Sequence, residues 1–557
     1  MNRPLRALVA FLLSLSCVLA MPGTASATVY AQIEGTGSTW SELIVQQWIA
    51  DVDSNGMKVV YTGGGSSKGR KDFSQDSTDF AISEIPYQGV DEQGNTDTSN
   101  GRDFAYLPIV AGGTAFTYQL KIGNELVRNL RLSGDTISKI FTNQITNWND
   151  PAIAADNNGR SFPSLAITPV VRSDGSGTTA QFTTWMDRQF PDIWRPFFGQ
   201  AGLTSYYPRE GRAIGQAGSD QVMNTIAGFA GNGTIGYVEY SYPVNKDYPV
   251  VKVLNQAGYY VEPTQYNVAV ALTKARINQD KSSPLYLTQE LDGVYTNADP
   301  RAYPISSYSY MIVPTGATDP RMTTAKRQTL ADFMYYSLCA GQTKAGPYGY
   351  SPLPLNLVRA GFEQLAKLKA ADPAVDLTDR EVTSCNNPTF VAGDLSKNHL
   401  AEIAPQPAVC DEQGEGPCGS ETGANDPAPE GDPAAPEEPQ PSAGGGSGGG
   451  SVGGGQAGGV GGNAAGASGR GSDGGATQPT DPGPSPSIDP ATGVEQPVAA
   501  SGSSDVVIYA NPTELAAERS VDRRTFGWLA VLELLALVLV PGLYVASLRR
   551  RPRGGVR

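Results

Sequence analysis

The chain has 557 residues, enough for more than one domain, and its formal net charge is −14 at pH 7. So acidic a protein lacks the basic surface that displaces counterions from nucleic acid, and this excludes a nucleic-acid-binding function. The same charge does not attract anions from a distance, so any anion site must act through short, desolvated hydrogen bonds.

The N-terminus has the pattern of a secretory signal peptide. Arg3 and Arg6 precede the apolar run 7–20, and Ala25-Ser26-Ala27 provides the small residues of a cleavage site. We therefore expect residues 1–27 to be removed on export.

Short apolar strands alternate with helices over residues 28–404, which predicts a folded α/β domain. Three helices have clear start signals. Thr39-Trp40-Ser41-Glu42 has the form of a capping box, while Ser133 and Ser219 begin two further amphipathic helices. Each of these residues is explained by helix capping alone, which is far commoner than ligand binding.

The segment 170–179 carries the clearest chemical signal. An apolar strand ends just before Arg172, a turn of small residues follows Asp174, and apolar residues then recur at helical spacing. A strand, turn and helix in this order direct backbone N–H groups and the positive end of the helix dipole to one point. Arg172 adds a guanidinium that fits a tetrahedral oxyanion with two parallel hydrogen bonds, so the segment predicts an anion site. The alternative is an Arg172–Asp174 ion pair on the surface.

Four cysteines remain after the signal peptide, and they permit three disulfide pairings. Cys410 and Cys418 flank a short acidic turn, so we expect them to pair with each other. Cys339 is then left to pair with Cys385. The chain has no CxxC motif and no Cys/His cluster, so we expect no metal site.

The C-terminal part predicts a tether and a membrane anchor. Residues 405–505 are mainly Gly, Pro, Ala, Ser and acids, which predicts a disordered linker. Residues 526–548 are long and apolar enough to cross a bilayer, with Glu533 as their one charge. The basic tail 549–557 predicts a cytoplasmic C-terminus. We expect a single-pass cell-membrane protein with an extracellular domain, in which Glu533 either contacts a partner helix or is merely tolerated.

Several segments, taken in order, resemble the PstS-type phosphate-binding proteins of ABC phosphate transporters. The resemblance covers most of residues 30–356. Its motifs are Gly35-Thr36-Gly37-Ser38-Thr39-Trp40, Tyr61-Thr62-Gly63-Gly64-Gly65-Ser66-Ser67, Asp79-Phe80-Ala81-Ile82-Ser83-Glu84-Ile85-Pro86, Ile145-Thr146-Asn147-Trp148-Asn149-Asp150-Pro151, the arginine loop, Gly233-Thr234-Ile235-Gly236-Tyr237-Val238 and Gly349-Tyr350-Ser351-Pro352-Leu353-Pro354.

The resemblance implies a two-lobed α/β clamp of the periplasmic-binding-protein type. One lobe combines residues near 28–112 with residues near 302–395, and the other spans about 113–301. Inorganic phosphate is then held between the lobes and handed to the permease subunits of an ABC transporter. The phosphate contacts implied by the matching motifs are Thr39, Trp40, Ser66, Glu84, Arg172, Ser176, Gly177 and Thr178, with Asp174 orienting the arginine.

Two of these positions depart from the family pattern. Glu84 stands where the family has aspartate, and Trp40 stands where it usually has phenylalanine. A carboxylate here accepts a hydrogen bond from the protonated oxygen of phosphate and rejects sulfate, which has no proton to donate. Glutamate keeps this chemistry but is one methylene longer. By itself, Glu84 is equally well explained as an exposed carboxylate at a strand end.

An enzymatic function has little support in the sequence. His399 is the single histidine, so a Ser–His–Asp triad is excluded unless another base replaces it, and neither GxSxG nor GxxxxGK[ST] occurs. We expect a binding protein without a cofactor. The alternative is a degenerate binding-protein fold that serves as a membrane-anchored surface interaction or structural module without transport.

Overall fold

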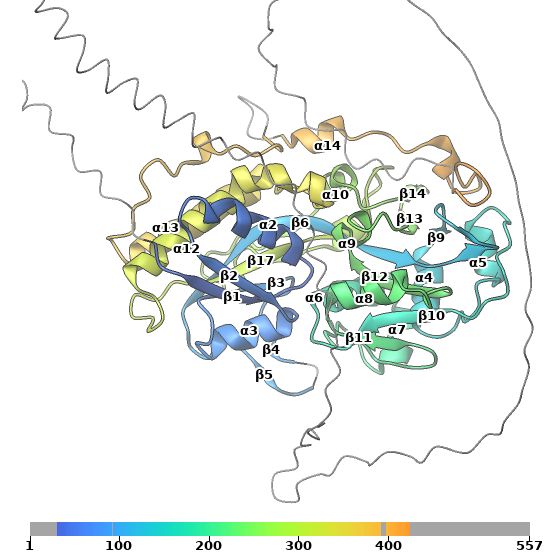
Figure 1. The fold of residues 1–557 in the computed structure, drawn as a ribbon, viewed down its shortest axis with the longest axis horizontal. Helices are drawn as coiled ribbons and strands as arrows, with labels where there is room; N and C mark the ends of the chain where they lie inside the picture. Colours follow the sequence, from blue (N-terminus) through green and yellow to red (C-terminus); the bar gives the residue numbers. More distant parts are fainter. Residues whose placement is uncertain (1–29, 92, 391–396, 424–557) are drawn as a thin grey trace, which may run out of the picture. The chain divides into compact units, whose positions relative to one another are not determined.

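An eight-stranded mixed sheet, ordered β11-β10-β12-β6-β17-β3-β1-β2, organises the part of the chain that the computed structural model describes, residues 30–91, 93–390 and 397–423. Its strands are β1 (Ile33–Gly37), β2 (Val59–Gly63), β3 (Phe80–Ser83), β6 (Phe104–Tyr118), β10 (Thr168–Arg172), β11 (Ile214–Gln216), β12 (Thr234–Glu239) and β17 (Ser306–Pro314). The long β6 pairs with β17 over residues 104–113 and with β12 over residues 114–118. Two lobes therefore share one strand (Figure 1).

The parallel strands of the two lobes run toward each other. β1, β2 and β3 follow the direction of β6, whereas β10, β11 and β12 run against it. The carboxyl ends of both sets consequently face the middle of β6, near Gly113. Ligands of open α/β sheets bind beyond the carboxyl ends of strands, so the residues after β1, β2, β3, β10 and β11 are placed to form one site.

Helices connect and cover the strands of both lobes. Those in the first lobe are α2 (Glu42–Asp53), α3 (Ser66–Ser74), α12 (Thr324–Leu338) and α13 (Leu355–Ala371). Those in or beside the second are α4 (Gly134–Phe141), α5 (Pro151–Asp156), α6 (Gly177–Gln189), α7 (Pro191–Phe198), α8 (Gly218–Ala227), α9 (Ser241–Val244), α10 (Gln265–Leu272), α11 (Asp292–Tyr295) and α14 (His399–Ile403). As predicted, Ser133 caps α4, since its side chain accepts from the Thr136 N–H.

The remaining elements are short. They are β4 (Gly89–Val90), β5 (Thr96–Asp97), β7 (Lys121–Ile122), β8 (Glu125–Leu126), β9 (Arg131–Leu132), β13 (Lys252–Leu254), β14 (Tyr260–Val261), β15 (Arg276–Ile277), β16 (Gln289–Glu290), η1 (Ala340–Lys344), η2 (Gly346–Tyr348), η3 (Val382–Ser384) and η4 (Val409–Asp411).

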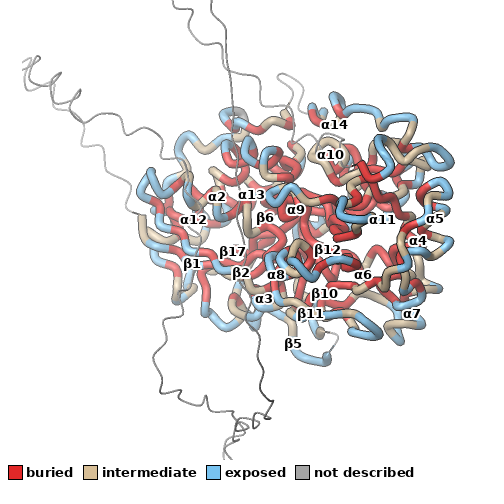
Figure 2. The backbone as a smooth tube through the Cα atoms, turned by 45° about the vertical axis from the view of Figure 1, so that its right-hand side comes forward, coloured by how far each residue is buried: buried red, intermediate tan, exposed pale blue. Residues whose placement is uncertain are grey.

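Buried residues follow the central sheet and the inner faces of its helices through both lobes (Figure 2). The predicted strand before Arg172 is β10, in which Val170 and Val171 have no exposed surface. The helical spacing noted after it corresponds to α6, which buries Phe182, Trp185 and Met186. The rigid core of the second lobe thus extends up to the arginine loop.

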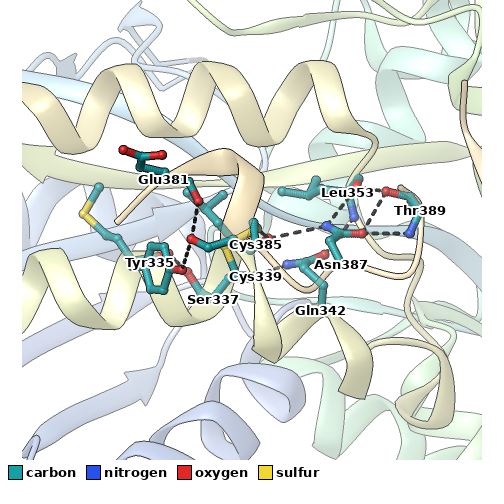
Figure 3. The surroundings of a disulfide bond; sticks show 12 residues. Tyr335, Ser337, Cys339, Gln342, Leu353, Glu381, Cys385, Asn387 and Thr389 are labelled. Carbon is teal, nitrogen blue, oxygen red and sulfur yellow. Dashed lines mark hydrogen bonds between the residues drawn. A yellow bond between two sulfur atoms is a disulfide. The ribbon is translucent and has the colours of Figure 1, made fainter. Parts of the chain in front are cut away.

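The disulfide Cys339–Cys385 ties the end of α12 to the segment that follows α13, which confirms this predicted pair. Nearby, the Asn387 side chain donates to the carbonyls of Leu338 and Leu353 (Figure 3). The covalent bond and these hydrogen bonds fix residues 385–389 to the first lobe.

The folded domain continues past residue 404, contrary to the expected start of the linker. Residues 409–422 lie against the second lobe, where Arg131 donates to the Cys410 carbonyl and Asn129 donates to the Cys418 carbonyl. The second predicted disulfide, Cys410–Cys418, closes this loop. The composition of the segment suggested disorder, but the side chains that hold it come from distant residues.

Among the residues that the structure describes, no helix is long and apolar enough to cross a membrane. The predicted signal peptide 1–27, most of the linker, the span 526–548 with Glu533 and the tail 549–557 lie outside the described residues.

Candidate functional site

The arginine loop is buried at the end of β10. Arg172 donates from Nε to Asp174 Oδ1 at 2.7 Å and from Nη2 to Asp174 Oδ2, while its Nη1 donates to Ser219 Oγ at 3.2 Å. Arg172 is 2% exposed, so the surface ion pair is excluded. Burial lowers the pKa of Arg172, but the Asp174 carboxylate outweighs it and raises the pKa above its ordinary value. The guanidinium is therefore a permanent buried cation.

The N-terminus of α6 adds helix-end donors beside this cation. Ser176 caps the helix, since its Oγ accepts from the Thr179 N–H at 3.2 Å. The N–H groups of Gly177 and Thr178, the first two residues of the helix, have no acceptor within it. Thr178 Oγ1 is also buried, with no hydrogen-bond partner in the described part of the chain. These groups can serve an anion.

Glu84 follows β3 and occupies the opposite side of the site. Its Oε1 accepts from Ser38 Oγ and, at 2.8 Å, from Ser309 Oγ, while its Oε2 accepts from Ser66 Oγ at 2.6 Å. The residue is 1% exposed, so the alternative of an exposed strand-end carboxylate is wrong. Three serine hydroxyls thus hold a carboxylate in place as an acceptor.

Thr39 connects the first lobe to the second. Its Oγ1 lies 3.0 Å from Ser219 Oγ and accepts from the Ser219 N–H at 3.3 Å. The expected capping box is not formed, because the cap of α2 is Ser41, whose side chain makes no cap hydrogen bond. Ser219 likewise caps no helix, since α8 begins at Gly218 with Ala217 as its cap. The side chains of Thr39 and Ser219 instead form a hydrogen bond with each other across the lobe interface.

Trp40 lies beneath the site with 1% of its surface exposed. The resemblance implied a phosphate contact from Trp40, but its backbone N–H donates to Ser38 Oγ at 3.0 Å. Its ring packs edge-on against Tyr350, and its Nε1 has no hydrogen-bond partner in the described part of the chain. In this arrangement Trp40 contributes packing to the site.

The two lobes touch so closely at the site that glycine is required. A Cβ on Gly177 would lie 2.0 Å from Glu84 Oε2 and 2.4 Å from Ser66 Oγ. Gly65 has φ +91°, and a Cβ there would lie 2.5 Å from the Gly175 carbonyl oxygen. That carbonyl accepts from the Ser67 N–H at 3.0 Å. Glu84, Ser66 and Ser67 of the first lobe therefore lie directly against Gly175 and Gly177 of the second, in a closed arrangement.

The sequence did not identify three serines of this cluster as site residues. Ser38 immediately precedes Thr39, so its neighbour was the only signal. Ser219 has the pattern of a helix cap, and Ser309 lies inside the buried strand β17, where nothing in the sequence distinguishes it. Within the described residues, no cluster of His, Cys, Asp and Glu could hold a metal ion.

The chain matches the family model described as a PBP superfamily domain over residues 22–340, more than half its length. It is 30% identical over 340 residues to the phosphate-binding protein PstS of Xylella fastidiosa, covering 61% of this chain and 86% of that protein. It is 31% identical over 353 residues to the phosphate-binding protein PstS 2 of Mycobacterium tuberculosis, covering 62% and 87%. The chain belongs to the PstS family.

A solved periplasmic phosphate-binding protein with bound phosphate is 19% identical to the chain, with a TM-score of 0.46, and covers 64% of this chain and 99% of that one. Membership of the PstS family agrees with the mixed α/β fold described above and with a solute-binding protein rather than an enzyme.

Proposed function

We propose that this PstS-family protein binds inorganic phosphate between its lobes and presents it to the permease of an ABC phosphate transporter. The observation that carries the proposal is the buried cluster of Arg172, the α6 N-terminus and Glu84 at the converging carboxyl ends of two parallel strand sets. A cation and helix amides offer donors, and a carboxylate offers an acceptor. Hydrogen phosphate has the complementary groups, since its unprotonated oxygens accept hydrogen bonds and its O–H group donates one.

Each side of the cluster suits a different part of that ion. Arg172 and the amides of Gly177 and Thr178 donate to unprotonated phosphate oxygens. Glu84 accepts from the protonated oxygen, and three serine hydroxyls hold its carboxylate in position as an acceptor. Sulfate would place an oxygen without a proton against the carboxylate. Two buried acceptors would then face each other without a hydrogen between them, which is unfavourable.

A degenerate fold without transport is not favoured. That alternative would gain support if Glu84 could not reach the anion, but the Glu84 carboxylate lies within the cluster.

The cellular arrangement is part of the proposal and rests on the sequence. Residues 1–27 direct export, the region after 423 acts as a tether, and residues 526–548 anchor the chain in the cell membrane with the tail 549–557 in the cytoplasm. The folded domain then captures phosphate outside the cell and stays attached near the permease.

Calorimetric titration of the purified chain, freed of phosphate by dialysis, tests the binding step. We expect saturable binding of one phosphate and no measurable heat with sulfate at the same concentrations. Equal binding of both anions would contradict the role of Glu84, and the absence of phosphate binding would contradict the proposed function.

A further inference from the structure

Ser219 forms a hydrogen-bonded link between the two lobes and the buried cation. Its Oγ accepts from Arg172 Nη1 at 3.2 Å and lies 3.0 Å from Thr39 Oγ1, and its N–H donates to the same Thr39 oxygen at 3.3 Å. Ser219 has no exposed surface, and Thr39 is 4% exposed. Water is therefore excluded from the chain Arg172–Ser219–Thr39, and its hydrogens have to find acceptors within it or on the bound ligand.

The direction of this chain is fixed by Arg172. A guanidinium only donates, so the Arg172 end supplies a proton and Ser219 Oγ accepts it. The Ser219 hydroxyl still has its own hydrogen, and among the described residues Thr39 Oγ1 is the one acceptor within hydrogen-bond distance of it. The opposite direction would leave the Ser219 hydrogen buried without a partner, which is costly, whereas this direction leaves the Thr39 hydrogen for the bound oxyanion.

Two donations from Ser219, one from its hydroxyl and one from its backbone, then fill both acceptor positions of Thr39 Oγ1. What remains to Thr39 is its own hydrogen, so it can only donate. We propose, on the basis of the proposed phosphate site, that Ser219 is a positioning residue that makes Thr39 an obligate donor to the bound oxyanion. Polarisation along the chain from the guanidinium strengthens that donation.

The start of α8 is suited to this role. Gly218 has φ +79° and donates its N–H to Asp174 Oδ1 at 3.1 Å, so the carboxylate that holds Arg172 also holds the residue before Ser219. Ser219 is consequently fixed relative to Arg172 in the second lobe. Its hydrogen bonds with Thr39 join the second lobe to the first, so Ser219 acts on Thr39 across the lobe interface.

The test is phosphate affinity by calorimetry, together with the phosphate dissociation rate, on the full chain with Ser219→Ala, Ser219→Thr and Thr39→Val. We expect Ser219→Ala to weaken phosphate binding roughly tenfold, mainly by faster dissociation, as for loss of one charge-linked hydrogen bond. Ser219→Thr keeps the hydroxyl and should restore most of the affinity. The matched control is Ser138→Ala in α4, which removes a buried hydroxyl that has no partner in the described part of the chain.

A double-mutant cycle separates positioning from mere packing. If Ser219 acts through Thr39, Ser219→Ala should have little further effect in a Thr39→Val background. Additive losses, or an unchanged affinity of Ser219→Ala, would overturn this inference while phosphate binding by the unmodified chain still supports the proposed function. Failure of the unmodified chain to bind phosphate would instead overturn both.

Discussion

The two sides of the site use the same residue type for opposite purposes. On the arginine side, the Ser219 hydroxyl accepts a hydrogen bond from the Arg172 guanidinium and donates one to Thr39 Oγ1. On the glutamate side, Ser38, Ser66 and Ser309 give their hydrogens to Glu84. The charged group at the base of each network sets the direction of its hydroxyls. The difference teaches that two buried charged groups can order serine hydroxyls in opposite senses, and we propose that this lets the site distinguish protonated from unprotonated oxygens.

Removing the cation should break the donor side most completely. We expect Arg172→Ala to weaken phosphate binding by at least about a hundredfold, since a buried bidentate charge is lost and Asp174 is left uncompensated. Arg188→Ala, in the helix α6 that follows the arginine loop but with its side chain 56% exposed, should leave affinity unchanged. Titration calorimetry measures both variants. A loss of less than threefold for Arg172→Ala would contradict the assignment.

Changing the acceptor side should alter selectivity as well as affinity. We expect Glu84→Gln to lower phosphate affinity roughly tenfold or more, because its amide adds a donor where the protonated oxygen donates. Sulfate, which we expect to bind poorly to the unmodified protein, should compete better with phosphate in this variant. Glu42→Gln is the control, since its oxygen can still accept from the Gly63 N–H. Unchanged sulfate competition in Glu84→Gln would contradict the acceptor role.

Thr178 tests whether an unpartnered hydroxyl belongs to the ligand. Thr178→Val removes a hydroxyl that makes no hydrogen bond within the described part of the protein, so we expect phosphate affinity to fall up to about tenfold with no loss in Tm. Thr183→Val in the same helix should do the reverse, because Thr183 Oγ1 donates to the Thr179 carbonyl and accepts from the Thr204 N–H. Equal Tm losses in both variants would assign Thr178 a structural role only.

A third carboxyl, Glu239 at the end of β12, is buried close to Trp40 with one oxygen lacking any partner in the described residues. Burial raises the pKa of Glu239 well above its ordinary value, although hydrogen bonds from Ser241 partly lower it. The folded state therefore retains a proton that the unfolded chain loses above its ordinary pKa of 4.5, so this group costs stability as pH rises from there. Glu239→Gln should gain Tm over the unmodified protein as pH increases from 4.5 to 8, in thermal unfolding followed by circular dichroism. The exposed control Glu34→Gln should show no such trend.

The sequence predicted best what is determined locally. The strand, turn and helix around Arg172 have the predicted order, because their apolar spacing and the small residues of the turn are neighbours in the chain. The cysteine pairs were also predictable, since a short loop between Cys410 and Cys418 left one other pair.

What the sequence could not predict depends on contacts between distant segments. Ser133 and Ser219 have the same local pattern, yet one caps a helix and the other reaches Thr39 across the lobe interface. Ser309 joins the site through the return strand β17 and has no local signature. The domain end was placed too early because residues after 404 are held by Arg131 and Asn129, which no composition window around residue 410 includes.

A crystal structure of the protein grown with phosphate tests the central claim most directly. We predict one phosphate between the lobes, bonded by Arg172 and the α6 amides, accepting from Thr39 Oγ1 and donating to Glu84. Phosphate bound elsewhere, with Arg172 and Thr39 contacting only protein groups, would contradict the account.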